Sequence, residues 1–150
     1  MKVIFLDFDG VLNSDRYIAR QGGGMAIDPE KLVLIKHLVD ATDARIVLTT
    51  SWRTHWDRDL TRCDSTGQEM TRLFSACGLE IWDKTPQLQN REAEIRAWLD
   101  AHPETSQFAV LDDRLLSAPF LREHFVKTSN YFGGLEEGDV KKAAEILKSR

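Results

Sequence analysis

The sequence predicts a single α/β domain over residues 1–150, in which a mostly parallel sheet carries helices on both faces. Short apolar runs alternate along the chain with segments whose apolar residues recur at helical spacing, the order typical of a parallel sheet. The apolar runs are continuous, as expected for strands that are buried on both faces. A chain of 150 residues is long enough to form one such domain with its own core.

The first third of the chain contains two predicted strands and one predicted helix. The first predicted strand runs from Val3 to Asp7, and the glycine-rich sequence through 22–24 predicts a turn and a short hairpin. Residues 28–30, Asp-Pro-Glu, combine an N-cap, a proline suited to the first helical position and a first-turn acid, so a helix is expected to begin there. Residues 45–48 predict the second strand.

Patterning in the remainder predicts three more strands and three more helices. The polar stretch 55–64 supports no assignment. The further elements are a helix over 68–76 ended by Gly78, a short strand over 79–82, a helix over 91–101, a strand over 107–111, a strand over 124–127 and a helix over about 137–148.

Net charge, cysteine spacing and the length of the apolar runs indicate which partners and which cellular compartment to expect. The net charge of −4 provides no global attraction to nucleic acid, so a polyanion would have to meet a local basic patch. Cys63 and Cys77 lack metal-ligand spacing and are expected to be reduced thiols, which fits the cytoplasm. The first apolar run is too short for a signal peptide, and no run is long enough to cross a bilayer, so we expect no membrane partner.

The run VIFLDFDGVLN over residues 3–13 brings two carboxylates to the end of the first predicted strand. Asp7 and Asp9 stand one residue apart just before Gly10, which lets the chain turn back. Ligands of open α/β sheets bind at this end of the strands. Two acids there repel each other unless a cation lies between them. The pattern therefore predicts a Mg²⁺ site in which one carboxylate binds metal and attacks an electrophile while the other transfers protons.

Two further predicted strands end in groups suited to phosphate chemistry. Thr50 and Ser51 follow the second strand, and Asp112 and Asp113 follow a later one. Because parallel strands present their carboxyl ends along one edge, we expect these residues to meet Asp7 there. A threonine hydroxyl donates to a phosphoryl oxygen without taking up the metal.

A phosphoryl group also needs a cation to stabilise the charge that develops during transfer. Arg91 lies near the start of a predicted helix, where the guanidinium fork and the positive helix end both favour an oxyanion. Lys84 is the alternative. Either residue alone is most simply a solvated surface cation, and within this set of motifs we favour Arg91.

In this order, the motifs resemble the four motifs of the haloacid dehalogenase (HAD) superfamily of Mg²⁺-dependent phosphohydrolases. The matching segments are Asp7-x-Asp9-Gly, an apolar run ending in Thr50-Ser51, a basic residue, and Leu-Asp112-Asp113. The runs DFDGVLN, IDPEKL and TTSWR, together with the helix that begins at Arg91, are similar to small HAD domains related to the Swiss Army knife RNA repair proteins. The resemblance implies a Rossmann-like HAD core.

The resemblance also implies catalytic and metal-binding roles. Asp7 would be the nucleophile that forms an aspartyl-phosphate, and Asp9 would protonate the leaving group and then activate water. Mg²⁺ would be held by the Asp7 carboxylate, the Asp9 backbone carbonyl and Asp112, with Asp113 as a further ligand through water.

The resemblance also implies that residues at the end of the second predicted strand bind the phosphate. Thr50 would bond the phosphoryl oxygens beside Ser51, and the neighbouring Thr49 remains the alternative because the strand register is open. Many members of the superfamily carry threonine two residues after the second aspartate, where this sequence has Val11. This departure removes one hydroxyl and leaves the attacking carboxylate unchanged.

We therefore expect a phosphomonoester hydrolase whose site is open. The spacing between the motifs leaves no room for a sizeable cap domain, which favours a large substrate such as a nucleic-acid end or phosphoprotein, or a site closed by another subunit. Arg53, Trp56 and Arg58 are the sequence candidates for contacting a nucleic acid. A solvated basic face and packed aromatic side chains are the alternative for these residues.

Two other functions remain in view. A small-molecule phosphatase or nucleotidase would use residues 22–24 and 55–64 as a partial lid. A non-catalytic module would keep the fold to bind phosphate or a protein partner. The presence of Asp7, Asp9, Thr50 and Asp112 argues against the module, since a degenerate site is expected to lose one of them.

Overall fold

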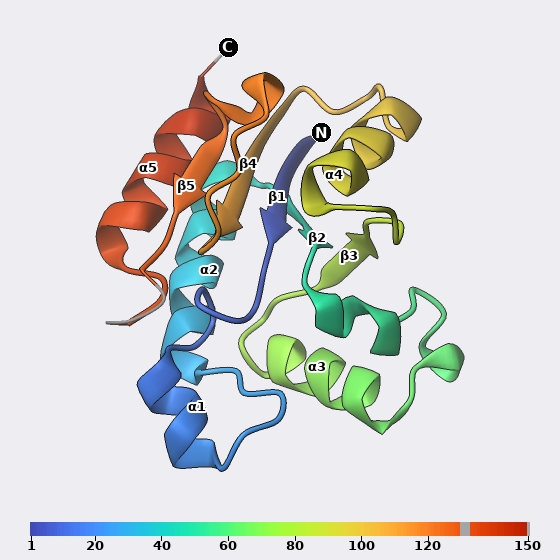
Figure 1. Cartoon of the computed structure of the whole chain (residues 1–150), viewed down its shortest axis with the longest axis vertical. Helices are drawn as coiled ribbons and strands as arrows, with labels where there is room; N and C mark the ends of the chain where they lie inside the picture. The colour runs from blue at the N-terminus through green and yellow to red at the C-terminus, as the bar shows by residue number, and fades with distance from the viewer. Residues whose placement is uncertain (130–132, 150) are drawn as a thin grey trace.

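The computed structural model describes residues 1–129 and 133–149 and confirms the predicted class of fold (Figure 1). The strands are β1 (Lys2–Leu6), β2 (Arg45–Leu48), β3 (Ile81–Lys84), β4 (Gln107–Asp112) and β5 (Phe125–Lys127). They form one sheet in the order β3-β2-β1-β4-β5, and every neighbouring pair is parallel. β1 is thus the central strand, flanked by β2 and β4.

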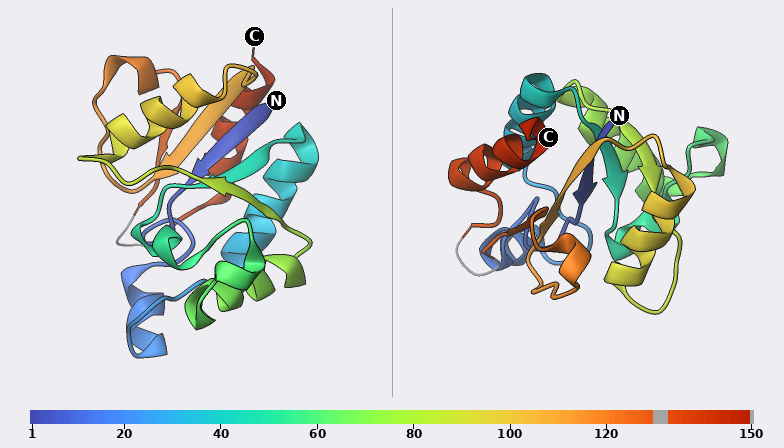
Figure 2. Two further views of the ribbon diagram at one scale, coloured as in Figure 1. Left: turned by 90° about the vertical axis from the view of Figure 1, so that its right-hand side faces the viewer. Right: turned by 90° about the horizontal axis from the view of Figure 1, so that it is seen from above.

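Helices cover both faces of this sheet. They are α1 (Asp15–Gln21), α2 (Pro29–Thr42), α3 (Ser65–Ala76), α4 (Arg91–Ala101) and α5 (Glu137–Lys148). Figure 2 shows α2 and α5 on one side of the strands and α4 on the other. Connections of the strand–helix–strand kind produce this arrangement.

The two faces of the sheet bury two separate apolar cores. Ile4 and Leu6 of β1 belong to the larger core, which α2, α3 and α5 cover. Val3 and Phe5 belong to the smaller core, which includes Trp98 of α4. Because side chains alternate along a strand, Asp7, the residue after β1, follows Phe5 onto the face of α4.

The predicted hairpin around residues 22–24 is wrong, because a short helix precedes these glycines. Ser14 caps α1 by accepting a hydrogen bond from the Tyr17 amide. Gly22 ends α1 in the left-handed conformation, with a φ of 80°. No residue of α1 is buried, so the helix lacks the apolar stripe by which sequence periodicity identifies a helix.

Other elements differ from expectation only at their ends or in type. α3 begins three residues before the predicted start because Asp64 caps it. The edge strand β3 lies two residues later than predicted. The unassigned stretch contains 3-10 turns, η1 (Ser51–His55) and η2 (Leu60–Arg62), and a third turn, η3 (Pro119–Leu121), precedes β5. No helix in the described ranges is long and apolar enough to cross a membrane.

Candidate active site

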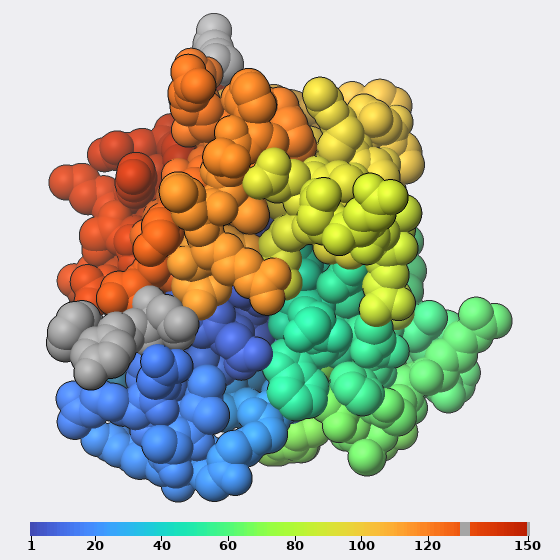
Figure 3. Space-filling model, viewed as in Figure 1, coloured from blue at the N-terminus to red at the C-terminus, as the bar shows by residue number. Residues whose placement is uncertain are grey.

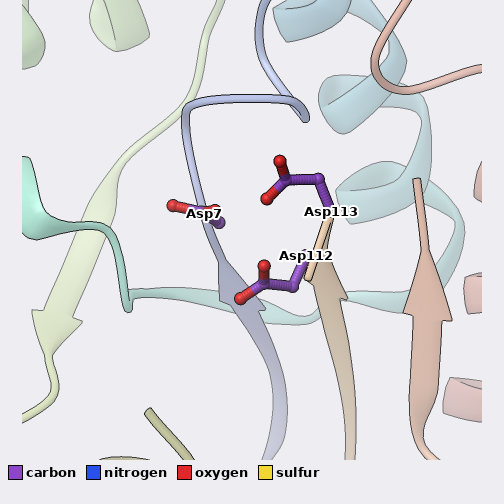
Figure 4. Close-up of side chains that lie close together, drawn as sticks. All are labelled: Asp7, Asp112 and Asp113. Carbon is purple, nitrogen blue, oxygen red and sulfur yellow. The ribbon is translucent and has the colours of Figure 1, made fainter. Parts of the chain in front are cut away.

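Three carboxylates meet at the carboxyl edge of the sheet. Asp7 follows β1, Asp112 is the last residue of β4, and Asp113 comes next. Each offers one oxygen that lies within 4.8 Å of those of the other two, and Figure 4 shows all three side chains between the ends of β1 and β4. In the space-filling view the segment after β1 is bordered by the segment after β4 and by η1 (Figure 3).

Main-chain pairing positions these acids. Leu6 of β1 lies opposite Leu111 of β4, and the Asp7 amide continues the ladder by donating to the Leu111 carbonyl at 3.1 Å. The Asp7 Oδ1 atom accepts from the Phe8 amide at 2.9 Å. Asp112 Oδ1 accepts from the Arg114 amide at the same distance. Backbone donors thus hold both carboxylates where the strands end.

Arg91 links two of these acids. It is the first residue of α4, directly after the N-cap Asn90, and it is buried. Its Nη1 atom lies 3.0 Å from Asp7 Oδ2 and 2.7 Å from Asp112 Oδ2. Lys84, the alternative cation, instead donates to the backbone carbonyls of Arg53 in η1 and of Trp56 directly after it. Of the two sequence candidates, Arg91 is the one that the structure brings to the acids.

Charge in this cluster is not balanced. Asp7 is only 5% exposed and Asp112 is fully buried, yet Arg91 is the one basic side chain among the described residues that pairs with them. Burial raises the pKa of Asp7 to about 7, against the lowering effect of Arg91, and the charge of Asp112 adds to the rise. Burial and then Asp112 also raise the pKa of Asp113. A cluster of this kind favours an added cation.

The carboxylate of Asp9 lies outside this cluster. Its Oδ1 atom accepts from Asn13 Nδ2 at 3.1 Å, and its Oδ2 atom accepts from Trp52 Nε1 at 3.2 Å. Asp9 is half-buried and is not one of the three acids whose oxygens gather. A metal contact from Asp9 would therefore fall to its backbone carbonyl, as the resemblance implies, and the side chain is left for other chemistry.

The end of β2 places two threonines differently. The Thr49 amide donates to the Leu6 carbonyl at 3.0 Å, so Thr49 lies beside Asp7 in the sheet. The Thr49 hydroxyl is buried and has no hydrogen-bond partner among the described residues. Thr50 instead caps η1, since its hydroxyl accepts from the Trp52 amide. Ser51 is exposed at the start of that turn.

Two of the residues predicted to contact nucleic acid are buried, which is a correction. Arg53 is 4% exposed, and its guanidinium donates to four backbone carbonyls and to Glu94. Trp56 belongs to the larger core. Arg58 is exposed, but it donates to the Trp82 carbonyl on β3 and lies over the Trp82 ring. Arg53 therefore binds the protein's own loops.

Sequence reasoning missed the neighbours of Asp9. Asn13 directly follows the apolar pair Val11-Leu12 and is fully buried. A buried side-chain amide needs hydrogen-bond partners, so a polar residue at this place in the sequence was a signal that could have been used. The indole N–H of Trp52 donates to the second aspartate of the DFDG run, a contact that spans 43 residues and leaves no local pattern.

The parallel sheet, with acids from β1 and β4 at its carboxyl edge, is that of a HAD-type domain. Comparison with known families narrows this class. Residues 3–140 match the family model described as the HAD domain in Swiss Army Knife RNA repair proteins, and the chain belongs to this family. No curated protein and no solved structure matches the chain. The resemblance seen in the motifs is thus confirmed at the level of the family.

Proposed function

We propose that this protein hydrolyses phosphate monoesters through an aspartyl-phosphate on Asp7, with Mg²⁺ as its cofactor. The observation that carries the proposal is the cluster of Asp7, Asp112 and Asp113 at the end of the strands. Asp7 and Asp112 are buried and share the guanidinium of Arg91, and Asp113 is half-buried beside them. Membership of a HAD family supports the same class of chemistry.

The donor set fits Mg²⁺. Carboxylate oxygens are the hard ligands this ion prefers, and three of them lie within reach of one centre. Arg91 offsets one charge, so ionised Asp7, Asp112 and Asp113 would leave an excess of negative charge in a buried place. When bound by these residues, Mg²⁺ would neutralise that excess. It would also reduce the electrostatic repulsion between the phosphate and the attacking carboxylate.

The protein's own residues carry the two steps of the reaction. An Asp7 oxygen attacks phosphorus, and the bond from phosphorus to the leaving oxygen breaks as Asp9 gives that oxygen its proton. In the second step a water attacks phosphorus and gives a proton to Asp9. The bond to the Asp7 oxygen then breaks, which releases inorganic phosphate and restores both aspartates.

Two further groups suit the phosphoryl oxygens. Arg91 supplies positive charge beside Asp7, and its Nε–H has no partner among the described residues. The hydroxyl of Thr49, the residue directly after β2, likewise has no partner within the described ranges. We assign the threonine role to Thr49, because its amide continues the ladder beside Asp7 and its buried hydroxyl has no other partner among the described residues.

The experiment that tests this function is phosphate release from an aryl phosphate with and without Mg²⁺. Asp7→Asn is expected to lower turnover by at least about 1,000-fold, because the amide cannot attack phosphorus. Asp100→Asn, which removes an exposed acid at the far end of α4, is the matched control. Release that survives both Asp7→Asn and a chelator would overturn the proposal.

We further propose a phosphorylated nucleic-acid end as the substrate. The family description names RNA repair proteins. The openness of the site also supports a large substrate: between β1 and α2 lies only the short helix α1, and between β3 and α4 only a loop. With Arg53 buried, the cation best placed for a polyanion is Arg114, which is exposed and follows Asp113 directly.

Oligonucleotides with a 3′- or 5′-phosphate and the matching mononucleotides test this substrate class. We expect a higher kcat/KM on the oligonucleotides, by a factor that shrinks as salt screens their phosphates. Arg114→Ala should reduce this factor. Arg122→Ala is the control and should not reduce it, because Arg122 is exposed but precedes the N-terminal end of β5, away from the carboxyl edge of the sheet. Equal or faster turnover of mononucleotides at low salt would favour a small-molecule phosphatase.

A further inference from the structure

Asp9 accepts a hydrogen bond on each of its carboxylate oxygens from a neutral side chain. Asn13 Nδ2 donates to Oδ1 at 3.1 Å, and Trp52 Nε1 donates to Oδ2 at 3.2 Å. The two donors come from separate segments of the chain, one from the turn after β1 and the other from η1. Together they fix the plane of the carboxylate.

The orientation of the Asn13 amide is set by its surroundings. Its Oδ1 atom accepts from the Gly10 amide at 2.9 Å, so its Nδ2 atom faces the other way. That nitrogen also donates to the Ala26 carbonyl at 2.6 Å. One partner requires an acceptor and the other a donor, so exchanging the two ends of the amide would break both contacts.

The indole of Trp52 is held as firmly. Its amide donates to the Thr50 hydroxyl at the start of η1, and its ring packs against the larger core. The His55 ring lies beside it, with centroids 5.9 Å apart. An indole N–H is a donor only, so its place opposite Oδ2 admits a single kind of contact.

We infer that Asn13 and Trp52 are positioning residues that hold the Asp9 carboxylate for proton transfer. This inference rests on the proposed role of Asp9. Each oxygen keeps one lone pair for the proton while its other lone pair is engaged. The same contacts hold the side chain away from Asp7, Asp112 and Asp113, so Asp9 stays a proton carrier and does not become a fourth carboxylate in that cluster.

The test compares leaving groups. Trp52→Phe removes the indole N–H and keeps an aromatic ring. The loss of turnover should therefore be largest on substrates whose leaving oxygen most needs a proton. We expect kcat on phenyl phosphate to fall about tenfold and kcat on 4-nitrophenyl phosphate to change by less than about threefold, with KM little altered. Trp56→Phe, the same substitution in the core, should leave the ratio of the two rates unchanged.

Asp9→Asn, measured in parallel, separates the two hypotheses. If this variant keeps its rate on phenyl phosphate, Asp9 is not the acid and that part of the proposed function fails. If it loses that rate while Trp52→Phe does not, only the positioning inference fails. An equal loss on both substrates in Trp52→Phe would also overturn the inference, because a general structural defect does not discriminate between leaving groups.

A second measurement reads the contact without turnover. The chain has four tryptophans, and the indole N–H signal of Trp52 in a ¹⁵N–¹H spectrum is the one absent from Trp52→Phe. Asp9→Asn should shift this signal, since it replaces the charged acceptor, and Asp15→Asn on exposed α1 should not. A Trp52 signal indifferent to Asp9→Asn would overturn the inference whatever the activity.

Discussion

Gly10 lies directly against the side chain of Asp113. A Cβ atom on Gly10 would stand 2.6 Å from the Asp113 Cβ, and the φ of Gly10 is 80°. The turn after β1 and the acid after β4 therefore approach each other only because this residue has no side chain. The relationship ties the first motif of the sequence to the last.

Gly10→Ala should disturb the acids as well as the fold. We expect it to lower the free energy of unfolding by more than the ~1–2 kcal/mol that a left-handed residue costs, and also to weaken Mg²⁺ binding. Gly23→Ala is the matched control, because its φ is 90° but an added Cβ would meet nothing within 4 Å. Equal losses in the two variants, measured by urea unfolding, would mean that the contact with Asp113 is unimportant.

The raised pKa of Asp7 predicts how stability depends on pH without metal. Folded Asp7 keeps its proton up to about pH 7, whereas the unfolded chain loses it near 3.8. The folded state thus binds more protons in this interval, and the free energy of unfolding should fall as pH rises through it. The total is on the order of 4 kcal/mol at most.

Asp7→Asn should remove most of that decline and make the metal-free protein more stable than the wild type near pH 8. Urea unfolding at several pH values in the presence of a chelator measures both curves. A wild-type curve that is flat or rises between pH 4 and pH 7 would contradict the predicted sign.

Mg²⁺ should raise the melting temperature of the wild type by an amount that grows with the logarithm of its concentration above the Kd. A ligand at 100 times its Kd adds about 2.7 kcal/mol to the free energy of unfolding. Asp112→Asn should shrink this rise, because it removes a fully buried carboxylate from the donor set. Asp100→Asn should leave the rise unchanged, and an unaltered response in Asp112→Asn would argue against the site.

The buried pair of Arg53 and Glu94, 2.7 Å apart, should be essential to the fold. Arg53→Met removes the only cation paired with the buried Glu94 among the described residues, together with the guanidinium donors to four backbone carbonyls. We therefore expect a loss of about 3–5 kcal/mol in the free energy of unfolding. Arg72→Met breaks an exposed pair with Glu69 and should change stability little. Similar losses in both variants would contradict the role of burial.

The parts of this protein that could be predicted from its sequence are those governed by regular geometry. Continuous apolar runs identified β1, β2 and β4, and the shared direction of parallel strands implied that acids far apart in sequence would converge. Asp7, Asp112 and Asp113 do so. The helix α1 was not predicted, because the sequence marks it only by its capping residues. It buries no residue, so it has no periodic apolar pattern.

Whether a charged side chain is buried or exposed was harder to predict from the sequence. Arg53 and Arg58 belong to one cationic stretch, yet the turn of η1 directs Arg53 inward to carbonyls from two loops and Glu94, while Arg58 stays exposed. Nothing in the order of residues distinguishes them. Likewise, Thr49 and Thr50 are adjacent and chemically identical, and only the ladder between β1 and β2 shows which one lies next to Asp7.

The contact of Arg58 with β3 has a consequence for how copies of this chain meet. β3 is an edge strand, and an edge offers unpaired backbone groups to any other strand. The Arg58 guanidinium already donates to the Trp82 carbonyl from two of its nitrogens and covers the ring beside it. The protein's own side chain thus occupies the place where a strand from another molecule would begin to pair. We therefore expect Arg58 to oppose pairing of β3 with a strand of a second copy of this chain.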